Sequence, residues 1–167
     1  MNKLFWIIIF SVFLVTSCAT TSTFQPHNPK TSQHWRVQGK IAMQDQGRAE
    51  TASLDWQQNV QNYQIRIFGP LGIGAVEING NPQGVELIDS KGQIHQAASA
   101  ELLSQQILGY PLPIADLVYW LKGVKTKHHH GWTVHYLSYH QNGMPKLMTA
   151  THQGINLRIF IDKWQFF

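Results

Sequence analysis

WRVQGKIAM, residues 35–43, is the stretch of sequence that decides the fold. Its alternate positions, beginning with Trp35 and Val37, are apolar or glycine, whereas Arg36, Gln38 and Lys40 stand between them. Successive side chains of a β-strand point to opposite faces, so this period of two predicts a strand with one buried and one solvated face. Half-buried strands of this kind are typical of antiparallel sheets.

The same alternation returns along the rest of the chain. It marks residues 52–56, 63–67, 74–78, 85–87, 132–136 and 155–161. Turn-forming residues separate the segments at 58–59, 69–70, 79–82 and 90–92. Short strands at this spacing predict either a β-sandwich or an antiparallel, barrel-like sheet.

Two helices are predicted between the strands. Ser99 is a suitable N-cap for a helix that ends before Gly109, with Glu101 near its positive end, and Leu103 and Ile107 share one face. A second helix follows Pro113 and ends at Lys122 and Gly123; its apolar stripe consists of Ile114, Leu117, Val118 and Leu121. A helical hairpin with an apolar face can lie across a curved sheet and cover it.

The N-terminus has the pattern of an exported lipoprotein. A basic start at Lys3 precedes an apolar run over residues 4–15, which is too short to span a bilayer. The sequence Val15-Thr16-Ser17-Cys18 resembles a lipobox, and Cys18 is the only cysteine in the chain. We expect residues 1–17 to be a signal peptide, Cys18 to be lipidated and residues 18–33 to form a flexible tether. The alternative is an ordinary signal peptide with an incidental cysteine.

The composition of the chain limits the possible folds and functions of the remaining domain, residues 34–167. A single cysteine excludes an internal disulfide, so the fold must rest on its apolar core. Charged residues make up 13% of the chain, about half the usual share. The net charge of +4 comes from scattered basic residues, which does not indicate nucleic-acid binding. No nucleotide-binding motif is present, and no cofactor is expected.

Together, the residues of this domain resemble the LolB family of outer-membrane lipoprotein receptors. The resemblance covers nearly the whole domain and is carried by motifs in a fixed order: Trp35 with Gly39-Lys40-Ile41-Ala42, Leu54-Asp55-Trp56, Tyr63 before Gly69-Pro70-Leu71-Gly72, Gly84-Val85-Glu86-Leu87, Asp89 with Lys91-Gly92, Ala100-Glu101-Leu102-Leu103, Pro111-Leu112-Pro113, Tyr119-Trp120-Leu121, Gly131-Trp132 with Val134 and Tyr136, and Ile161-Asp162-Lys163-Trp164.

The resemblance implies a mainly β fold, an open, unclosed antiparallel β-barrel with a helical lid inserted between strands. It implies a protein lipid-anchored to the periplasmic face of a Gram-negative outer membrane. There the family accepts triacylated lipoproteins from a LolA-type periplasmic carrier and inserts them among the outer-membrane phospholipids. Leu71 matches the protruding leucine that acts in membrane insertion in the family.

Acyl-chain transfer requires an apolar cavity, because burial of each methylene is worth about 0.8 kcal/mol. Periodicity alone cannot distinguish cavity lining from a packed core. The candidate lining residues on the strands and the lid are Trp56, Ile65, Ile67, Val76, Ile78, Leu87, Leu103, Ile107, Leu117, Trp120, Leu121, Trp132, Ile159 and Ile161.

Two other functions compete with lipoprotein transfer: the protein could be a scaffolding lipoprotein with a packed barrel, or a lipid-processing enzyme.

The run His128-His129-His130 raises the question of a metal site, but no carboxylate or cysteine stands near it in sequence, and a solvated turn is expected instead. The aspartates are scattered singly, and no Ser-His-Asp spacing stands out. We therefore predict neither a metal site nor an enzyme.

Overall fold

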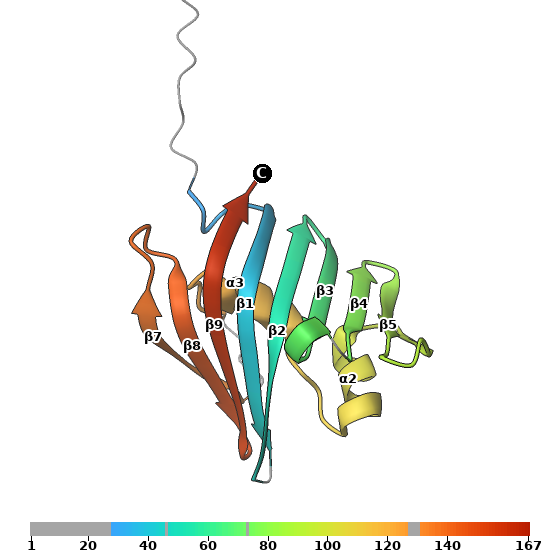
Figure 1. Ribbon diagram of the computed structural model, residues 1–167. Coiled ribbons are helices and arrows are strands. Elements are labelled where there is room, and N and C mark those ends of the chain that lie inside the picture. The colour runs from blue at the N-terminus through green and yellow to red at the C-terminus, as the bar shows by residue number, and fades with distance from the viewer. Residues whose placement is uncertain (1–27, 46, 73, 127–130) are drawn as a thin grey trace, which may run out of the picture.

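The computed structural model describes residues 28–45, 47–72, 74–126 and 131–167 (Figure 1). The strands are β1 (His34–Asp45), β2 (Arg48–Asn59), β3 (Asn62–Phe68), β4 (Val76–Asn81), β5 (Gly84–Ile88), β6 (Ile94–Ala97), β7 (Thr133–Tyr139), β8 (Pro145–His152) and β9 (Ile155–Phe166). The helices are α2 (Ala100–Leu108), α3 (Ile114–Leu121) and a short 3-10 helix, η1 (Pro70–Gly72).

All described strands belong to one sheet. Their order is β6-β5-β4-β3-β2-β1-β9-β8-β7, and every neighbouring pair is antiparallel. The sheet begins at β6 and ends at β7, so it is open. This confirms the mainly β fold with a helical insertion. Because there is one sheet rather than two, the sandwich alternative is wrong.

Residues 35–43 lie in β1, in the middle of the sheet. Trp35 and Val37 have no exposed area, whereas Lys40 on the opposite face is exposed. We call the face that carries Trp35 the inner face and the face that carries Lys40 the outer face. Gly39 permits the close approach of β9, because a Cβ atom there would lie 2.0 Å from the backbone oxygen of Phe160.

The helices begin and end where the sequence predicts. The Ser99 side chain accepts a hydrogen bond from the backbone N–H of Leu102 at 3.3 Å, and Gly109 ends α2 with a φ of 87°. Lys122 and Gly123 end α3. Figure 1 shows α3 behind the sheet, where its Leu117, Trp120 and Leu121 join the inner-face core.

Two strands were not predicted, and the predicted apolar face of α2 is buried only in part. Alternation did not indicate β6 or β8. Ile107 lies one helical turn after Leu103 on the same side of α2, but it is 43% exposed, because α2 buries only its first half, at Ala100 and Leu103. Within the described ranges, no helix is long and apolar enough to cross a membrane.

Candidate functional site

The main core lies between the inner face of the sheet and α3. Its buried residues come from β1, β2, β3, β8, β9 and α3, together with Trp132. Leu117, Trp120 and Leu121 are at most 3% exposed. Full burial of a leucine is worth about 1.5–3 kcal/mol, so these side chains hold α3 firmly on the sheet.

A second, smaller core joins α2 to β5 through Val85, Ala100 and Leu103. Three partly buried side chains contact both cores: Tyr63, Ile78 and Ile114. We call this junction the seam. At the seam, therefore, the described side chains that connect the two cores are only partly buried.

A cavity of about 310 Å³ lies at the seam, and we call it the seam cavity. It is bounded by the β2–β3 turn, the β4–β5 turn, the start of α2 and one side of α3. Its walls are apolar toward Val85, Ile114 and Val118 and polar toward Gln61 and Glu101. The full lining consists of Gln58, Val60, Gln61, Tyr63, Asn81, Gly84, Val85, Ala98, Ser99, Ala100, Glu101, Ile114, Ala115, Val118 and Tyr119.

Tyr63 forms one wall of the seam cavity. Its ring crosses Gly80 on β4, where a Cβ atom would lie 2.0 Å from the Cζ of Tyr63. Burial, aided by the negative charge of Glu101, raises the pKa of Tyr63 to about 12. The phenol is therefore uncharged at neutral pH, and this wall offers an aromatic ring and a neutral hydroxyl.

A second cavity, of about 240 Å³, also contacts α3. It is lined by Trp120, Lys125, Trp132, Thr133, Val134 and Tyr136. The Trp120 and Trp132 rings lie 6.5 Å apart between their centroids. The seam cavity therefore runs along one side of α3 from Ile114 to Tyr119, and the second cavity meets α3 near its end, at Trp120. Leu117 and Leu121 pack into the main core.

Two hydrogen bonds fasten the end of α3. The hydroxyl of Tyr136 on β7 donates to the backbone oxygen of Trp120 at 3.0 Å. The Nζ of Lys122 donates to the backbone oxygen of Ser32 at 3.2 Å, and burial lowers the pKa of this lysine. At the other end, Glu101 on α2 accepts from the backbone N–H of Ala115 at 3.4 Å. The two helices are thus joined to each other as well as to the sheet.

Most of the predicted cavity residues lie in the packed cores. Buried positions are Trp56, Ile65, Leu103, Leu117, Trp120, Leu121, Trp132, Ile159 and Ile161; partly buried positions are Ile67, Val76, Ile78 and Leu87; Ile107 is exposed. Of these residues, Trp120 and Trp132 line the second cavity, and none lines the seam cavity. Sequence reasoning missed the seam cavity, although Tyr63, Val85 and Glu101 stand in the motifs that carry the family resemblance.

Several predicted positions lie outside the described residues. Cys18 and His128–His130 are among them. The backbone of Leu71 belongs to η1, but its side chain is outside the described part. Among the residues described, no group of three His, Cys, Asp or Glu is placed to hold a metal ion.

Comparison with known proteins establishes the family. Residues 33–164 match the family described as "Outer membrane lipoprotein LolB". The chain belongs to the LolB family. The matched residues include the whole inner-face core and both helices. As a LolB-family protein it is a lipoprotein of the Gram-negative outer membrane, with a role in lipoprotein localization and transport.

Relatives named "Outer-membrane lipoprotein LolB" match over nearly their full length. One from Francisella tularensis is 28% identical, over 92% of this chain and 90% of its own. Another, from Coxiella burnetii, is also 28% identical, over 95% of this chain and 91% of its own. A DUF1329 family protein from Desulfovibrio piger has a similar fold, with a TM-score of 0.52 at 9% identity, covering 81% of this chain and 86% of its own.

Proposed function

We propose that this LolB-family protein accepts triacylated lipoproteins from a LolA-type periplasmic carrier and inserts them into the outer membrane. The observation that carries the proposal is the seam cavity, which lies between an apolar helical lid and the sheet of a LolB-family domain. Acyl chains of the client enter at the seam, beside Ile114 and Val118. The polar rim at Gln61 and Glu101 faces the linkage between the chains and the client polypeptide.

Energetics favour entry at the seam. The 310 Å³ cavity is at the lower end of the range for ligand pockets, so longer chains require α3 to move away from the sheet. That movement would expose Leu117 and Leu121, but an acyl chain would replace their apolar contacts. Exchange of one apolar neighbour for another is nearly neutral, so transfer needs neither nucleotide hydrolysis nor a covalent step. We therefore propose a carrier rather than an enzyme.

Attachment and delivery involve residues that lie mostly outside the described part; residues 28–33 are described, and Ser32 is buried. We propose that Cys18 carries the lipid anchor, that residues 18–33 act as a tether and that Leu71 enters the bilayer during delivery. Leu71 stands in the motif Gly69-Pro70-Leu71-Gly72, which joins β3 to β4 through η1. Burial of one leucine contributes only about 1.5–3 kcal/mol, too little to anchor a protein but enough to bring the mouth of a cavity to a lipid surface.

A transfer assay with two variants tests the proposal. Val118→Glu places a charge in the seam cavity, and we expect at least a roughly tenfold loss of lipoprotein acceptance from the carrier, because an unpaired charge in an apolar site is costly. Leu108→Glu is the matched control, since Leu108 is 41% exposed on α2 and does not line the seam cavity. Equal acceptance by the two variants, with folding verified by circular dichroism, would overturn the seam as the entry site.

Leu71→Asp tests delivery separately. Acceptance from the carrier should be retained, whereas delivery to liposomes should fail. Equal delivery by Leu71→Asp and the parent protein would remove Leu71 from the mechanism. Loss of acceptance together with delivery would assign this residue to the core or to carrier docking.

A further inference from the structure

A row of paired residues crosses the outer face of the sheet, and three of its five side chains, Leu147, Phe160 and Phe68, are apolar. Leu147 pairs with Phe160, and Phe160 pairs with Lys40. Lys40 pairs in turn with Ser53, and Ser53 with Phe68. Residues directly opposite each other in antiparallel strands share a face, so these five residues form one row on the outer face, which we call the outer row. The outer row ends one residue before Gly69 and η1, the segment that carries Leu71.

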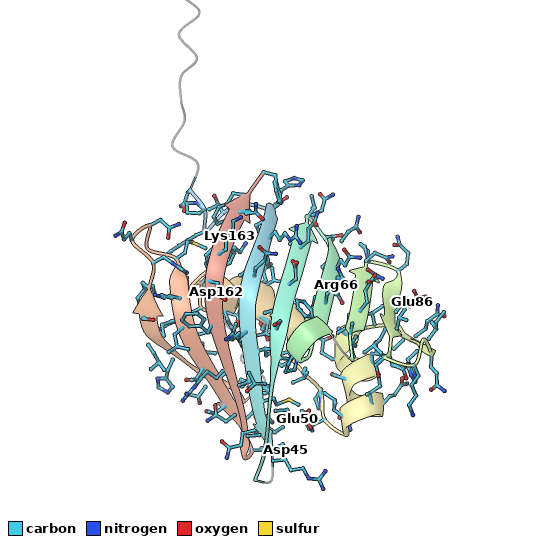
Figure 2. All side chains as sticks on the ribbon, in the orientation of Figure 1. Asp45, Glu50, Arg66, Glu86, Asp162 and Lys163 are labelled. Atoms are coloured by element: carbon cyan, nitrogen blue, oxygen red, sulfur yellow. The ribbon has the colours of Figure 1, made fainter. Side chains whose placement is uncertain are left out.

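Basic side chains flank the part of the outer row that lies on β8, β9 and β1. The Nζ of Lys146 lies 5.7 Å from the centroid of the Phe160 ring. Arg158 and Lys163 on β9 are exposed, as is Lys40 within the row. Figure 2 labels Lys163 and its neighbour Asp162 on β9, and Arg66 farther across the sheet on β3.

The nearby carboxylates do not neutralise this group of cations. Asp55 on β2 accepts from Nε of Arg36 at 2.7 Å and from Gln38 at 3.1 Å, while Glu77 lies 3.9 Å from Arg66. Among the described residues, none of Lys40, Lys146, Arg158 and Lys163 forms an ion pair. Strands β1, β8 and β9 carry two acidic residues, Asp45 and Asp162. Strand alternation places Asp45 on the inner face. Asp162 is therefore the acidic residue of these strands that can lie beside the four cations.

We propose that the outer row and its four cations are a contact surface for an anionic phospholipid bilayer. Aromatic and aliphatic side chains ringed by Lys and Arg are suited to the headgroup region, where the cations meet lipid phosphates and the long side chains extend over apolar surface. Continuity with η1 supports a bilayer as the occupant, because contact along the outer row brings Leu71 to the same surface. The inference rests on the proposed membrane attachment but not on acyl-chain transfer.

Site-directed fluorescence on the full, acylated protein tests this surface. With Cys18 acylated, Ser53→Cys introduces a single free thiol in the outer row for an environment-sensitive dye. Ser90→Cys, in the exposed turn between β5 and β6, is the matched control. Both proteins are reconstituted into phosphatidylethanolamine vesicles with or without phosphatidylglycerol, and quenching by lipids with a nitroxide on the headgroup is measured.

We expect the nitroxide lipids to quench the dye at position 53 but not at position 90. The quenching at position 53 should be stronger in vesicles that contain phosphatidylglycerol and weaker at high salt. A second test combines Lys40→Gln and Lys163→Gln with Ser53→Cys. From the quenching at position 53, the ratio of molecules whose outer row lies on the membrane to molecules whose outer row is free should fall roughly fivefold for each charge removed. Lys91→Gln with Lys125→Gln removes two cations outside the outer row and should leave the ratio unchanged.

Equal quenching at positions 53 and 90, or quenching indifferent to phosphatidylglycerol and salt, overturns the inference. So does a change in dye emission at position 53 that appears only after a carrier protein is added, without quenching by the nitroxide lipids, which would assign the outer row to carrier docking. Lipoprotein transfer is measured on the same samples. Intact transfer without quenching at position 53 would reject this surface while leaving the proposed function in place.

Discussion

The Nζ atom of Lys122 donates a hydrogen bond to the backbone oxygen of Ser32 across 3.2 Å and so ties the end of α3 to the segment that leads into β1. Lys122 is only 6% exposed and has no carboxylate partner among the described residues; its Nζ lies 5.7 Å from the centroid of the Tyr119 ring. The proposed lid and the proposed tether therefore meet at one buried lysine.

Lys122 should make stability depend on pH in the alkaline range. Burial lowers its pKa in the folded protein below the ordinary value of 10.5. Between the folded and unfolded pKa values the unfolded chain binds more protons, so the free energy of unfolding contributed by Lys122 rises with pH through that window. Below it the lysine is charged in both states and its contribution is constant.

Denaturant titrations of the parent protein and Lys122→Met check this. The stability of the parent relative to the variant should increase as pH is raised toward 10.5, a comparison that cancels the titration of other groups. Lys91→Met, at an exposed turn, should show no such trend. A difference between the parent and Lys122→Met that stays constant with pH would contradict the burial of a charged Lys122.

Tyr136→Phe should loosen the lid without disturbing the core. The change removes the 3.0 Å hydrogen bond to the backbone oxygen of Trp120 and should cost about 1 kcal/mol of unfolding free energy. Amide hydrogen exchange should accelerate in α3 more than in β1. Tyr139→Phe is the control, because Tyr139 is 53% exposed at the edge strand. Unaltered exchange in α3 would mean that this bond does not hold the lid.

The phenols of Tyr63 and Tyr136 should weaken the fold at high pH. Burial raises both pKa values from 10.0 to about 12. The stability due to these neutral phenols is fully present below pH 10 and is lost as pH rises from 10 toward 12. In Tyr136→Phe, part of this alkaline loss should disappear. An identical alkaline slope in the variant would show that Tyr136 titrates normally.

Gly39→Ala should destabilise the pairing of β1 with β9. Its Cβ would lie 2.0 Å from the backbone oxygen of Phe160, so one strand must shift, and overpacking of this kind costs about 1–3 kcal/mol. Thr51→Ala, at an exposed position on β2, should change the unfolding free energy by less than about 0.5 kcal/mol. Equal stability of Gly39→Ala and the parent would contradict the close approach of these strands.

The sequence predicts the centre of the sheet well because large apolar side chains alternate there. Trp35, Val37 and Trp56 all lie on the inner face, as expected. In β8 the pattern is obscured, because Met148 points to the core while Leu147 belongs to the outer row. In β6 the large apolar residue, Ile94, is 61% exposed at the sheet edge. Alternation of apolar and polar residues cannot reveal a strand when the side chains on its two faces do not differ in polarity.

The seam cavity was harder to predict for a different reason. It is formed where four segments distant in sequence fail to fill the space between them, and periodicity reports only which residues face inward. Inward positions such as Ile159 and Ile161 are therefore packed core, while Val60, in the β2–β3 turn, and Asn81, at the end of β4, line the cavity. Helical spacing puts Ile107 on the same side of α2 as Leu103, but it does not show that the burial of α2 stops before Ile107.

Photo-crosslinking at the seam tests the central claim most directly. Benzoylphenylalanine replaces Ile114, which lines the seam cavity, or Leu137, which is 56% exposed on β7. Each protein receives a triacylated lipoprotein from the carrier under illumination, and adducts are identified by mass spectrometry. We expect an adduct with the acyl chains at position 114, none at position 137 and none with an unacylated client. Efficient transfer without an adduct at position 114, or equal adducts with the unacylated client, would contradict it.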